Sequence, residues 1–282
     1  MQAHPAAPRR IWLCADDYGL SPAVDQAIRD LVAHGRLNAT SVMVATPAFD
    51  RAAAEALAKL NAEAPRVAIG LHVTLTAPFK PLSADFAPLK SGAFLPIGGM
   101  MTHAFLCRLD RQLLGAEMAA QFAAFRAAFG RPPDFVDGHH HVHLLPQVRD
   151  AVLTAVQRFA PKAWVRQCGR ALPLLQRFAD RKGLLLDLLS FGFCRRAANL
   201  GLRTNPGFAG TYHFGAGMPF AELFPRFLDR LPDGGVVMCH PGLVDDELRR
   251  LDSLTTRREE EYAYFAGDAF TLALTAHNVT LA

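Results

Sequence analysis

Short apolar runs alternate with stretches of helical periodicity in the first third of the chain. Ile11–Ala15, Ser41–Ala45 and Val67–Leu75 have the composition of buried parallel strands. Between them, apolar residues recur at helical spacing over 21–35 and 48–60, which predicts one helix in each segment. Strands that alternate with helices indicate βαβ units and a mostly parallel sheet.

The alternation is interrupted at Pro78–Met101, which holds four prolines, three glycines and little periodicity. A loop of this length within a domain is usually functional, so we expect a lid or a binding loop there. The glycine-rich segment 172–217 is assigned no element, and we expect Asn199–Gly217 within it to shape the substrate pocket. The remaining expected elements are helices over Arg111–Phe129, Pro146–Phe159, Phe220–Leu231 and Thr255–Phe265, strands over Asp134–Asp137, Ala163–Arg166 and Gly235–Cys239, and a closing helix and short strand.

About seven strands are expected in total, a number that favours a closed or nearly closed α/β barrel over an open sheet. Residues 1–9, rich in Ala, Pro and Arg, are expected to form a flexible N-terminus. No repeat of fixed period and no shift in composition marks a second domain. We therefore expect residues 10–282 to form a single α/β barrel domain.

Composition narrows the class of protein. Hydrophobic residues make up 51% and charged residues 20% of the 282 residues, which predicts a folded chain with a sizeable core. No apolar run reaches the roughly 20 residues that a membrane helix needs. The net charge is +4 with scattered arginines, which argues against nucleic acid as a partner. Five cysteines without a CxxC pair argue against a disulfide framework and for a cytoplasmic location.

Aspartate and histidine residues follow four of the expected strands. Asp16 and Asp17 follow the first strand, and His72 lies near the end of the third. His139 begins a histidine cluster after a later strand, and His240 follows the last clear strand. Because the carboxyl ends of parallel strands gather at one face, we expect these side chains to form one site.

Asp16 and Asp17 have two interpretations. Adjacent carboxylates at a strand end are unfavourable unless a positive charge compensates them. In the structural interpretation, one caps the following helix and the other faces water. In the functional interpretation, one binds a metal ion and the other acts as a general base beside it.

The segment Asp137–His143 contains four histidines in five residues. If it is extended, His139, His141 and His143 face one way. Metal binding or catalysis is expected, because several buried imidazoles would otherwise each need a partner. Asp137 is expected to orient one of these rings, as carboxylates do for ligating histidines.

Three further residues have both a functional and a structural interpretation. His72 lies in an apolar strand and is either a ligand or a hydrogen-bonded core residue. His240 precedes a tight turn and is placed to act as a general acid. Arg166 ends a strand, where it orients a carboxylate, holds a substrate oxygen or forms an ordinary surface ion pair.

Aspartate with two or more histidines is typical of hydrolytic metal sites, because nitrogen and carboxylate ligands suit Zn²⁺ and similar ions. Such an ion lowers the pKa of water and polarises a carbonyl group. A carboxylate then takes a proton, and a histidine protonates the leaving amine. The sequence contains no GxSxG motif and no P-loop or GxGxxG after a strand. Amide hydrolysis without a protein nucleophile is therefore the predicted chemistry.

The sequence resembles a known family in four motifs that share its order and spacing. These motifs are Ala15–Ser21, Gly70–His72, Asp137–His143 and His240–Gly242. Together they resemble those of the YdjC-like carbohydrate deacetylases, which include chitooligosaccharide deacetylases and hopanoid-biosynthesis-associated deacetylases. The resemblance extends from about Arg10 to the C-terminus. Tyr18 stands where Phe is usual, and the unbroken run His139–His141 is closer to the chito-oligosaccharide branch.

This resemblance implies a distorted α/β barrel similar to the polysaccharide deacetylase fold and one divalent metal ion, Mg²⁺ or Zn²⁺. By the resemblance, Asp17, His72 and His139 are the metal ligands. Asp16 then corresponds to the general base and His240 to the general acid. The implied reaction removes N-acetyl groups from small amino sugars or chito-oligosaccharides.

His141, His143 and Arg166 are the candidates for contacts with the substrate, and the two histidines alternatively support the metal ligands. The Phe-rich segments Ala93–Leu106 and Phe208–Phe224 are candidates for a lid or for the interface of a homodimer. The sequence leaves open which sugar is bound, and whether it is phosphorylated or lipid-linked.

Two other functions stay open. A binuclear amidohydrolase on a (β/α)₈ barrel would use the pair His141 and His143, although that class carries its pair on an early strand, where Asp16 and Asp17 stand here. A non-catalytic carbohydrate-binding protein would have no need of an acid such as His240. One bound ion supports the deacetylase, and two bridged ions support the amidohydrolase.

Overall fold

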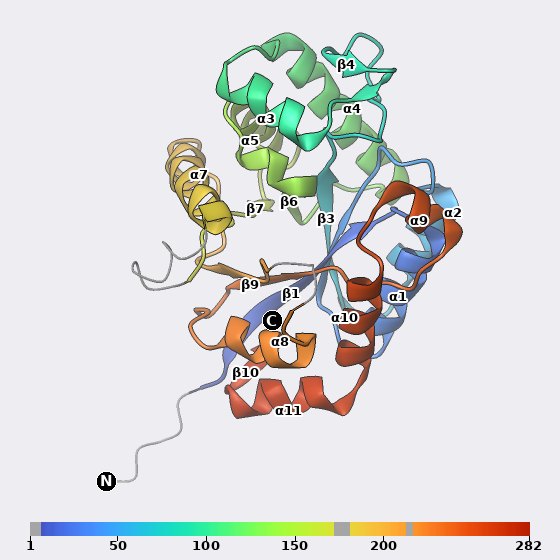
Figure 1. Cartoon of the computed structure of the whole chain (residues 1–282), viewed down its shortest axis with the longest axis vertical. Helices are drawn as coiled ribbons and strands as arrows, with labels where there is room; N and C mark the ends of the chain where they lie inside the picture. Colours follow the sequence, from blue (N-terminus) through green and yellow to red (C-terminus); the bar gives the residue numbers. More distant parts are fainter. Residues whose placement is uncertain (1–6, 172–180, 213–216) are drawn as a thin grey trace.

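A curled sheet of parallel strands runs through the molecule, and helices surround it (Figure 1). The computed structural model describes residues 7–171, 181–212 and 217–282. The strands are β1 (Arg9–Tyr18), β2 (Ala39–Val42), β3 (Ala68–Val73), β6 (Phe135–Gly138), β7 (Trp164–Val165), β8 (Phe208–Ala209), β9 (Val236–Cys239) and β10 (Val279–Leu281). Their order is β7-β6-β3-β2-β1-β9-β8, with β10 beside β1, and every pairing is parallel.

The two ends of this strand order approach each other through isolated bridges. Val165 of β7 pairs with Thr204, and Arg170 pairs with Phe208 of β8. The main-chain N–H of Val165 donates to the carbonyl oxygen of Arg203 at 2.9 Å. The sheet therefore curls into a distorted, partly closed α/β barrel, which confirms the predicted fold class.

Helices follow most of the strands and pack on the outside of the sheet (Figure 1). They are α1 (Pro22–Ala33), α2 (Arg51–Lys59), α3 (Ile97–Phe105), α4 (Arg111–Phe129), α5 (Val148–Phe159), α7 (Arg181–Asn199), α8 (Phe220–Leu228), α9 (Asp246–Leu251), α10 (Thr256–Ala266) and α11 (Asp268–Ala276), with the 3₁₀ turn η1 (His139–Leu144). The predicted start of the first helix is confirmed, because Ser21 caps α1 and Pro22 is its first residue. Within the described ranges, no helix is both long enough and apolar enough to span a membrane.

The segment predicted as a long loop before Met101 contains regular structure. It holds the hairpin of β4 (Leu89–Lys90) and β5 (Ala93–Phe94), and then α3. Gly98 and Gly99 weaken the helical pattern of α3, which is why the sequence did not predict it. The carboxylate of Glu117 on α4 accepts the main-chain N–H groups of Leu82 and Ser83 at 3.2 and 2.8 Å. This segment is thereby fixed to the body of the barrel.

Helix α7 is the second element that the sequence did not predict. Gly183 and Gly192 lower its intrinsic helix propensity. A Cβ at Gly192 would lie 2.9 Å from the guanidinium of Arg149 on α5, so this glycine permits close packing of the two helices. Residues 172–180 and 213–216 of the unassigned segment lie outside the described residues.

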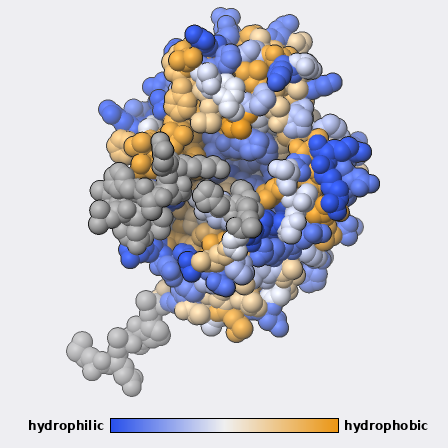
Figure 2. Space-filling view, viewed as in Figure 1, coloured by the Kyte–Doolittle hydropathy of each residue, from blue (hydrophilic) through white to orange (hydrophobic). Residues whose placement is uncertain are grey.

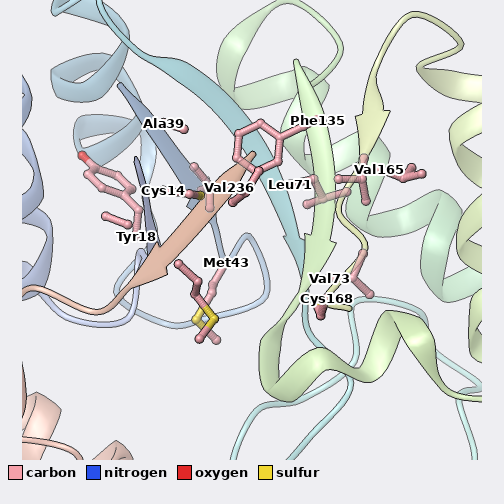
Figure 3. Packing of buried hydrophobic residues seen from close by; sticks show 14 of the residues in the cluster. Cys14, Tyr18, Ala39, Met43, Leu71, Val73, Phe135, Val165, Cys168 and Val236 are labelled. Carbon is pink, nitrogen blue, oxygen red and sulfur yellow. The ribbon is translucent and has the colours of Figure 1, made fainter. Parts of the chain in front are cut away.

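The core fills the inside of the curled sheet and the space between the sheet and the helices (Figure 3). The ring of Phe135 on β6 stacks on Trp164 of β7 with centroids 4.5 Å apart. The same ring covers Gly70 of β3, where a Cβ would lie 2.4 Å from it. Gly70 therefore permits β3 and β6 to pack under this ring, two residues before His72. Burial of each large apolar side chain here stabilises the fold by about 1.5–3 kcal/mol.

A separate group of aromatic rings joins α8, α10 and α11. Phe265 of α10 packs within 5.4 Å of Phe220 and 5.3 Å of both Phe224 and Phe270, measured between ring centroids. All four side chains are buried. This contact fixes the position of α10, which contributes residues to the site described next.

Candidate active site

The carboxyl ends of the central strands surround a cavity of about 810 Å³. It is lined by Asp16 and Asp17 of β1, His72 of β3, His139 after β6 and His240 after β9. Figure 2 shows the molecule hollowed between α3 and α10, with hydrophilic surface inside the hollow. The structure thus brings together the five residues that the sequence placed at strand ends, on the face where parallel α/β folds form active sites.

Both carboxylates face the cavity because β1 is irregular where it ends. The pairing of β1 with β2 shifts register between Ala15 and Tyr18, and Asp17 has a φ of 71°. In a regular strand, adjacent side chains point to opposite faces, so this bulge lets Asp16 and Asp17 reach one cavity. A left-handed backbone at a residue other than glycine is strained, and such strain clusters at functional sites.

Asp17, His72 and His139 form a group of potential metal ligands whose donor atoms lie within 4.8 Å of one another. Oδ1 of Asp17 lies 2.9 Å from Nδ1 of His139 and 3.3 Å from Nε2 of His72. Burial opposes ionisation of Asp17, but His139 and Arg258 hold its pKa well below the ordinary value. One carboxylate oxygen and two imidazole nitrogens are a donor set that suits a divalent metal and leaves positions for other ligands.

Asp137 orients the ring of His72. Its Oδ1 lies 2.6 Å from Nδ1 of His72, its neighbour in the β3–β6 register, and Oγ of Ser41 lies 3.0 Å from the same nitrogen. A metal ion would bind this ring in its neutral form, with the proton on Nδ1 and the lone pair on Nε2, beside Asp17. Burial disfavours the charged ring, but Asp137 and Asp16 raise the pKa of His72 to about 10. The prediction that Asp137 orients a ring of the histidine cluster is wrong. Asp137 instead orients the ring of His72, because these two residues are cross-strand neighbours on β6 and β3.

Arg166 binds Asp16 through both of its terminal nitrogens. Nη1 lies 2.6 Å from Oδ1, and Nη2 lies 2.7 Å from Oδ2. Nη1 also lies 3.1 Å from Oδ2 of Asp137. Burial works against the Asp16 carboxylate, but Arg166 and His72 lower its pKa below the ordinary value. The site therefore holds Asp16 in the ionised form and in one orientation.

A second group of potential ligands consists of Cys14, Asp16 and Asp137. The guanidinium of Arg166 lies between the two carboxylates of this group and already supplies its positive charge. Of the two groups found in the part of the chain that the structure describes, Asp17, His72 and His139 are therefore the better candidate for a metal site.

His240 follows β9 and lines the cavity. Its main-chain N–H donates to Oε2 of Glu261, and the phenol of Tyr212 donates to Oε1, both at 2.5 Å. Glu261 is fully buried, and burial raises its pKa to about 7. Burial also lowers the pKa of His240 to about 4, so its ring is neutral at neutral pH. Glu261 therefore fixes the backbone that carries His240.

The histidine cluster is not an extended strand. β6 ends at Gly138, and in the 3₁₀ turn that follows, His140 and His141 have φ values of 55° and 57°. The prediction that His139, His141 and His143 face one way is therefore wrong. His143 folds back against Gly138, where a Cβ would lie 3.1 Å from Nδ1 of His143. This turn directs His139 into the cavity and His143 away from it.

Of the three residues expected to contact the substrate, only His141 lines the cavity. Its Nδ1 lies 3.5 Å from Sγ of Cys168. His143 and Arg166 have no exposed surface, and Nε2 of His143 lies 2.8 Å from the carbonyl oxygen of Arg166. This placement does not support these two as substrate contacts. Instead, Arg166 binds Asp16, and His143 contacts the main chain of Arg166.

Arg258 is a site residue that the sequence analysis missed. It lies on α10, 241 residues after Asp17, and its Nη2 donates to Oδ2 of Asp17 at 2.6 Å. The available signal was weak: Arg258, Glu261 and Phe265 recur at helical spacing, which places two charged residues on the buried face of α10. A buried charge in such a position is normally paired.

One wall of the cavity is apolar. It is formed by Ile97 and Met101 of α3, Leu145 after η1, and Leu185, Leu186 and Leu189 of α7. On the outer side of α7, Leu188 and Phe191 are 65% and 76% exposed, and Figure 2 shows hydrophobic surface along the α3 and α7 edge of the hollow. A charged centre beside an apolar wall suits a ligand with one polar and one apolar part.

Two curated relatives match most of the chain. The chitooligosaccharide deacetylase of Citrobacter koseri is 28% identical over 242 residues, which cover 84% of this chain and 82% of that protein. The chitooligosaccharide deacetylase of Yersinia pestis is 30% identical over 240 residues, which cover 83% of this chain and 82% of that protein.

A solved structure from Enterococcus faecalis shares the fold. It carries the name of a cellobiose-phosphate cleavage protein and has a TM-score of 0.75 and 22% identity over 98% of this chain and 97% of its own. A peptidoglycan N-acetylglucosamine deacetylase is more distantly similar, with a TM-score of 0.49 and 9% identity over 97% of this chain and 85% of its own. Residues 10–276 match the YdjC-like protein family, and this range includes every residue of the cavity described above, so the chain belongs to that family.

Proposed function

We propose that this protein is a metal-dependent N-deacetylase of small amino sugars. The observation that carries the proposal is the group of Asp17, His72 and His139, which converges beside an Asp16 carboxylate held by Arg166. The names of the two curated relatives, both chitooligosaccharide deacetylases, support N-acetylated amino sugars as the class of substrate.

The residues fit one divalent ion. Two imidazole nitrogens and one carboxylate oxygen favour Zn²⁺ over Mg²⁺, because Mg²⁺ prefers oxygen ligands. Asp137 and Ser41 fix the ring of His72 so that Nε2 is free to bind. When bound, such an ion supplies Lewis acidity, which acidifies water and polarises the amide carbonyl.

Asp16 acts as the general base. Arg166 keeps it ionised, and Ser41 donates to its Oδ1 at 3.3 Å while lying 3.0 Å from Nδ1 of His72. Ser41 thus connects the base to a metal ligand and fixes their relative positions. The lowered pKa makes Asp16 a weak base, so it removes a proton only from water that the site has acidified.

His240 acts as the general acid on the leaving nitrogen. With a pKa of about 4, its ring is neutral in the free enzyme, so it must gain a proton during the reaction. Asp16 lines the same cavity and is the group that holds a proton after water is deprotonated. Transfer from Asp16 to His240 and then to the amine returns both residues to their initial states.

The apolar wall supports an amino sugar that carries an apolar group, such as a lipid-linked sugar. The cavity, of about 810 Å³, has room for more than a single sugar ring, and Leu185, Leu186 and Leu189 line it together with the charged residues. Sugar hydroxyls would leave these leucines without matched contacts, whereas an alkyl chain buries them favourably.

A binuclear amidohydrolase is less well supported. That class needs a second group of ligands beside the first, and here the neighbouring carboxylates of Asp16 and Asp137 bind Arg166. The pair His141 and His143 does not converge, because His143 points away from the cavity.

Acetate release from a substrate panel tests the proposed activity. The panel contains N-acetylglucosamine, chitobiose, chitotriose, their phosphorylated forms and octyl N-acetylglucosaminide, each incubated with the Zn²⁺-loaded protein. The proposal predicts acetate from at least one member, and from the octyl glycoside most rapidly. The same protein stripped of metal with a chelator is the control and should release none.

Each outcome is informative. Equal rates with and without metal would contradict a metal-dependent mechanism. Faster acetate release from chitotriose than from the octyl glycoside would assign the apolar wall to another role and retain the deacetylase. Binding of two ions per chain, with hydrolysis of a non-sugar amide, would favour the amidohydrolase.

A further inference from the structure

The guanidinium of Arg258 lies between two carboxylates. Its Nη2 donates to Oδ2 of Asp17 at 2.6 Å and to Oδ2 of Asp252 at 2.8 Å. Its Nε donates to the carbonyl oxygen of Leu254 at 3.1 Å. The side chain of Arg258 is 1% exposed, whereas that of Asp252 is 26% exposed at the edge of the cavity. A line of charges therefore runs from the cavity edge to a candidate metal ligand.

The two oxygens of Asp17 have different partners, because Arg258 binds only one of them. Oδ2 is taken by Arg258, and Oδ1 lies 2.9 Å from His139 and 3.3 Å from His72. A carboxylate with one oxygen held by an arginine presents only the other to a metal. A free carboxylate rotates and presents either oxygen or both.

We propose that Arg258 is a positioning residue that holds Asp17 as a one-oxygen metal ligand. This inference rests on the proposed metal-binding role of Asp17 and deepens it. The bulge of β1 places the backbone of Asp17 in a left-handed conformation, and that backbone alone does not fix the rotation of the carboxylate. Arg258 supplies the missing constraint from a distant helix.

The charge of Arg258 by itself would repel a divalent ion. Asp252 lies 2.8 Å from Nη2 and compensates that charge, so the pair of Arg258 and Asp252 is neutral as a unit. What remains is the orienting effect on Asp17. Removal of Arg258 should therefore weaken metal binding, and removal of the Asp252 charge alone should also weaken it.

Helix α10 is built to hold this arginine in place. Phe265, two turns further along α10, is packed among the aromatic rings of α8 and α11. Asp252 accepts the main-chain N–H of Leu254 at 2.9 Å, which closes the turn before α10. The part of α10 that carries Arg258 is therefore fixed both by the turn before the helix and by the packing of Phe265.

Zn²⁺ affinity of the metal-stripped protein tests this role without any activity measurement. Isothermal titration or chelator competition is run on the wild type, Arg258→Met, Arg258→Lys and Asp252→Asn. Arg258→Met should raise the Kd for Zn²⁺ about 10- to 100-fold, the usual effect of removing a residue that orients a ligand. Arg258→Lys should restore part of the affinity, because an ammonium can contact Asp17 with fewer hydrogen bonds.

Arg131→Met is a matched control. Arg131 also forms a two-nitrogen ion pair, with Asp134 at 2.8 and 2.9 Å, but lies outside the cavity lining. Its variant should bind Zn²⁺ as the wild type does. Circular dichroism and a thermal melt without metal establish that each variant is folded.

A double-mutant cycle with Asp17→Asn identifies the route of the effect. If Arg258 acts through Asp17, the double variant should bind Zn²⁺ no more weakly than Asp17→Asn alone. Unchanged or tighter Zn²⁺ binding by folded Arg258→Met would overturn the inference. Failure of the wild type itself to bind Zn²⁺ would instead remove the proposed metal site, so the two failures are distinguishable.

Discussion

Arg166 and Asp16 form a buried two-pronged ion pair, with nitrogen–oxygen distances of 2.6 and 2.7 Å. The pair connects the end of β7 to the end of β1, which are far apart in the strand order. Both side chains are at most 2% exposed, so each buried charge needs the opposite charge of its partner for compensation. The proposed base thus owes both its ionised form and its orientation to one arginine.

Arg166→Lys should reduce turnover strongly while retaining the fold. A lysine keeps the charge and loses the two-pronged contact, so Asp16 loses its fixed orientation. A misplaced base costs on the order of 10²-fold in kcat, with a smaller change in KM. Steady-state acetate release measures both constants. An unchanged kcat would contradict the positioning role.

Arg166→Met should destabilise the protein more than it affects any single catalytic step. It would leave Asp16 and Asp137 buried without their cation, which costs about 3–5 kcal/mol. Urea unfolding measures the loss, with Arg131→Met as the partly exposed control pair. Equal losses in the two variants would argue that the buried pair has no special energetic role.

Single alanine substitutions of Asp17, His72 and His139 should lower metal content, because each removes one of three donor atoms. His240→Ala should retain the metal and lose turnover by about 10²–10⁴-fold, the usual contribution of a positioned acid or base. Metal analysis of the purified variants separates the two classes. Full metal occupancy after removal of His72 would contradict its assignment as a ligand.

Leu185→Ser should discriminate between substrates. The substitution removes an apolar contact that stabilises the bound octyl group by about 1–2 kcal/mol. This loss should lower kcat/KM for the octyl glycoside about 5- to 30-fold. The value for chitobiose should change little, because a disaccharide does not bury that side chain. Parallel losses for both substrates would indicate that Leu185 supports the fold and does not contact an alkyl group.

Asp25→Asn should stabilise the protein at alkaline pH. Burial raises the pKa of Asp25 to about 7 against the opposing effect of the Gly19 N–H, which it accepts at 2.5 Å. An unfolded Asp titrates near about 4, so the wild type loses folding free energy as pH rises from about 4 to about 7. The loss is at most on the order of 4 kcal/mol, since each pKa unit is about 1.4 kcal/mol.

Asn keeps the acceptor for Gly19 and does not ionise. Thermal melts at pH 5 and pH 8 should therefore show a gain for the Asp25→Asn variant over the wild type that grows with pH. A gain that is equal at both pH values would show that the effect does not arise from ionisation of Asp25.

The strand ends of the site could be predicted because each is marked locally. A strand end of this kind is recognised within a single segment, as an apolar run followed by Asp or His. The parallel arrangement of the strands then brings these Asp and His residues to one face of the sheet. Asp16, Asp17, His72, His139 and His240 were found in this way, and the family resemblance is confirmed. Of their environment, only the contact of Arg166 with a carboxylate was among the stated interpretations, and the other partners depend on contacts between distant segments.

Arg258 illustrates that limit most clearly. Its partner Asp17 is 241 residues away, and the local sequence of α10 gives only a weak signal, the helical spacing of Arg258 with Phe265, which does not identify that partner. The predicted conformation of the histidine cluster was wrong for another reason. The positive φ values of His140 and His141 arise where β6 must end, and a pattern of side chains does not report backbone handedness.

The helices α3 and α7 were missed because glycines interrupt their periodicity. Gly192 is required by the approach of Arg149, which is a packing requirement and not a helix signal. Tertiary contacts therefore override local propensity in both elements. They form the apolar wall: the sequence indicated a binding segment up to Met101 but not its helical structure, and it did not indicate the contribution of α7.

Acetate release by the wild type and Asp16→Asn, compared at equal, measured metal content, tests whether Asp16 is the general base. Asparagine keeps the size of the side chain and one acceptor for Arg166, but it cannot take a proton. If Asp16 is the base, the variant should bind one ion per chain as the wild type does and release acetate at least about 10²-fold more slowly. Acetate release at the wild-type rate from the metal-loaded variant would contradict Asp16 as the base and, with it, the proposed mechanism.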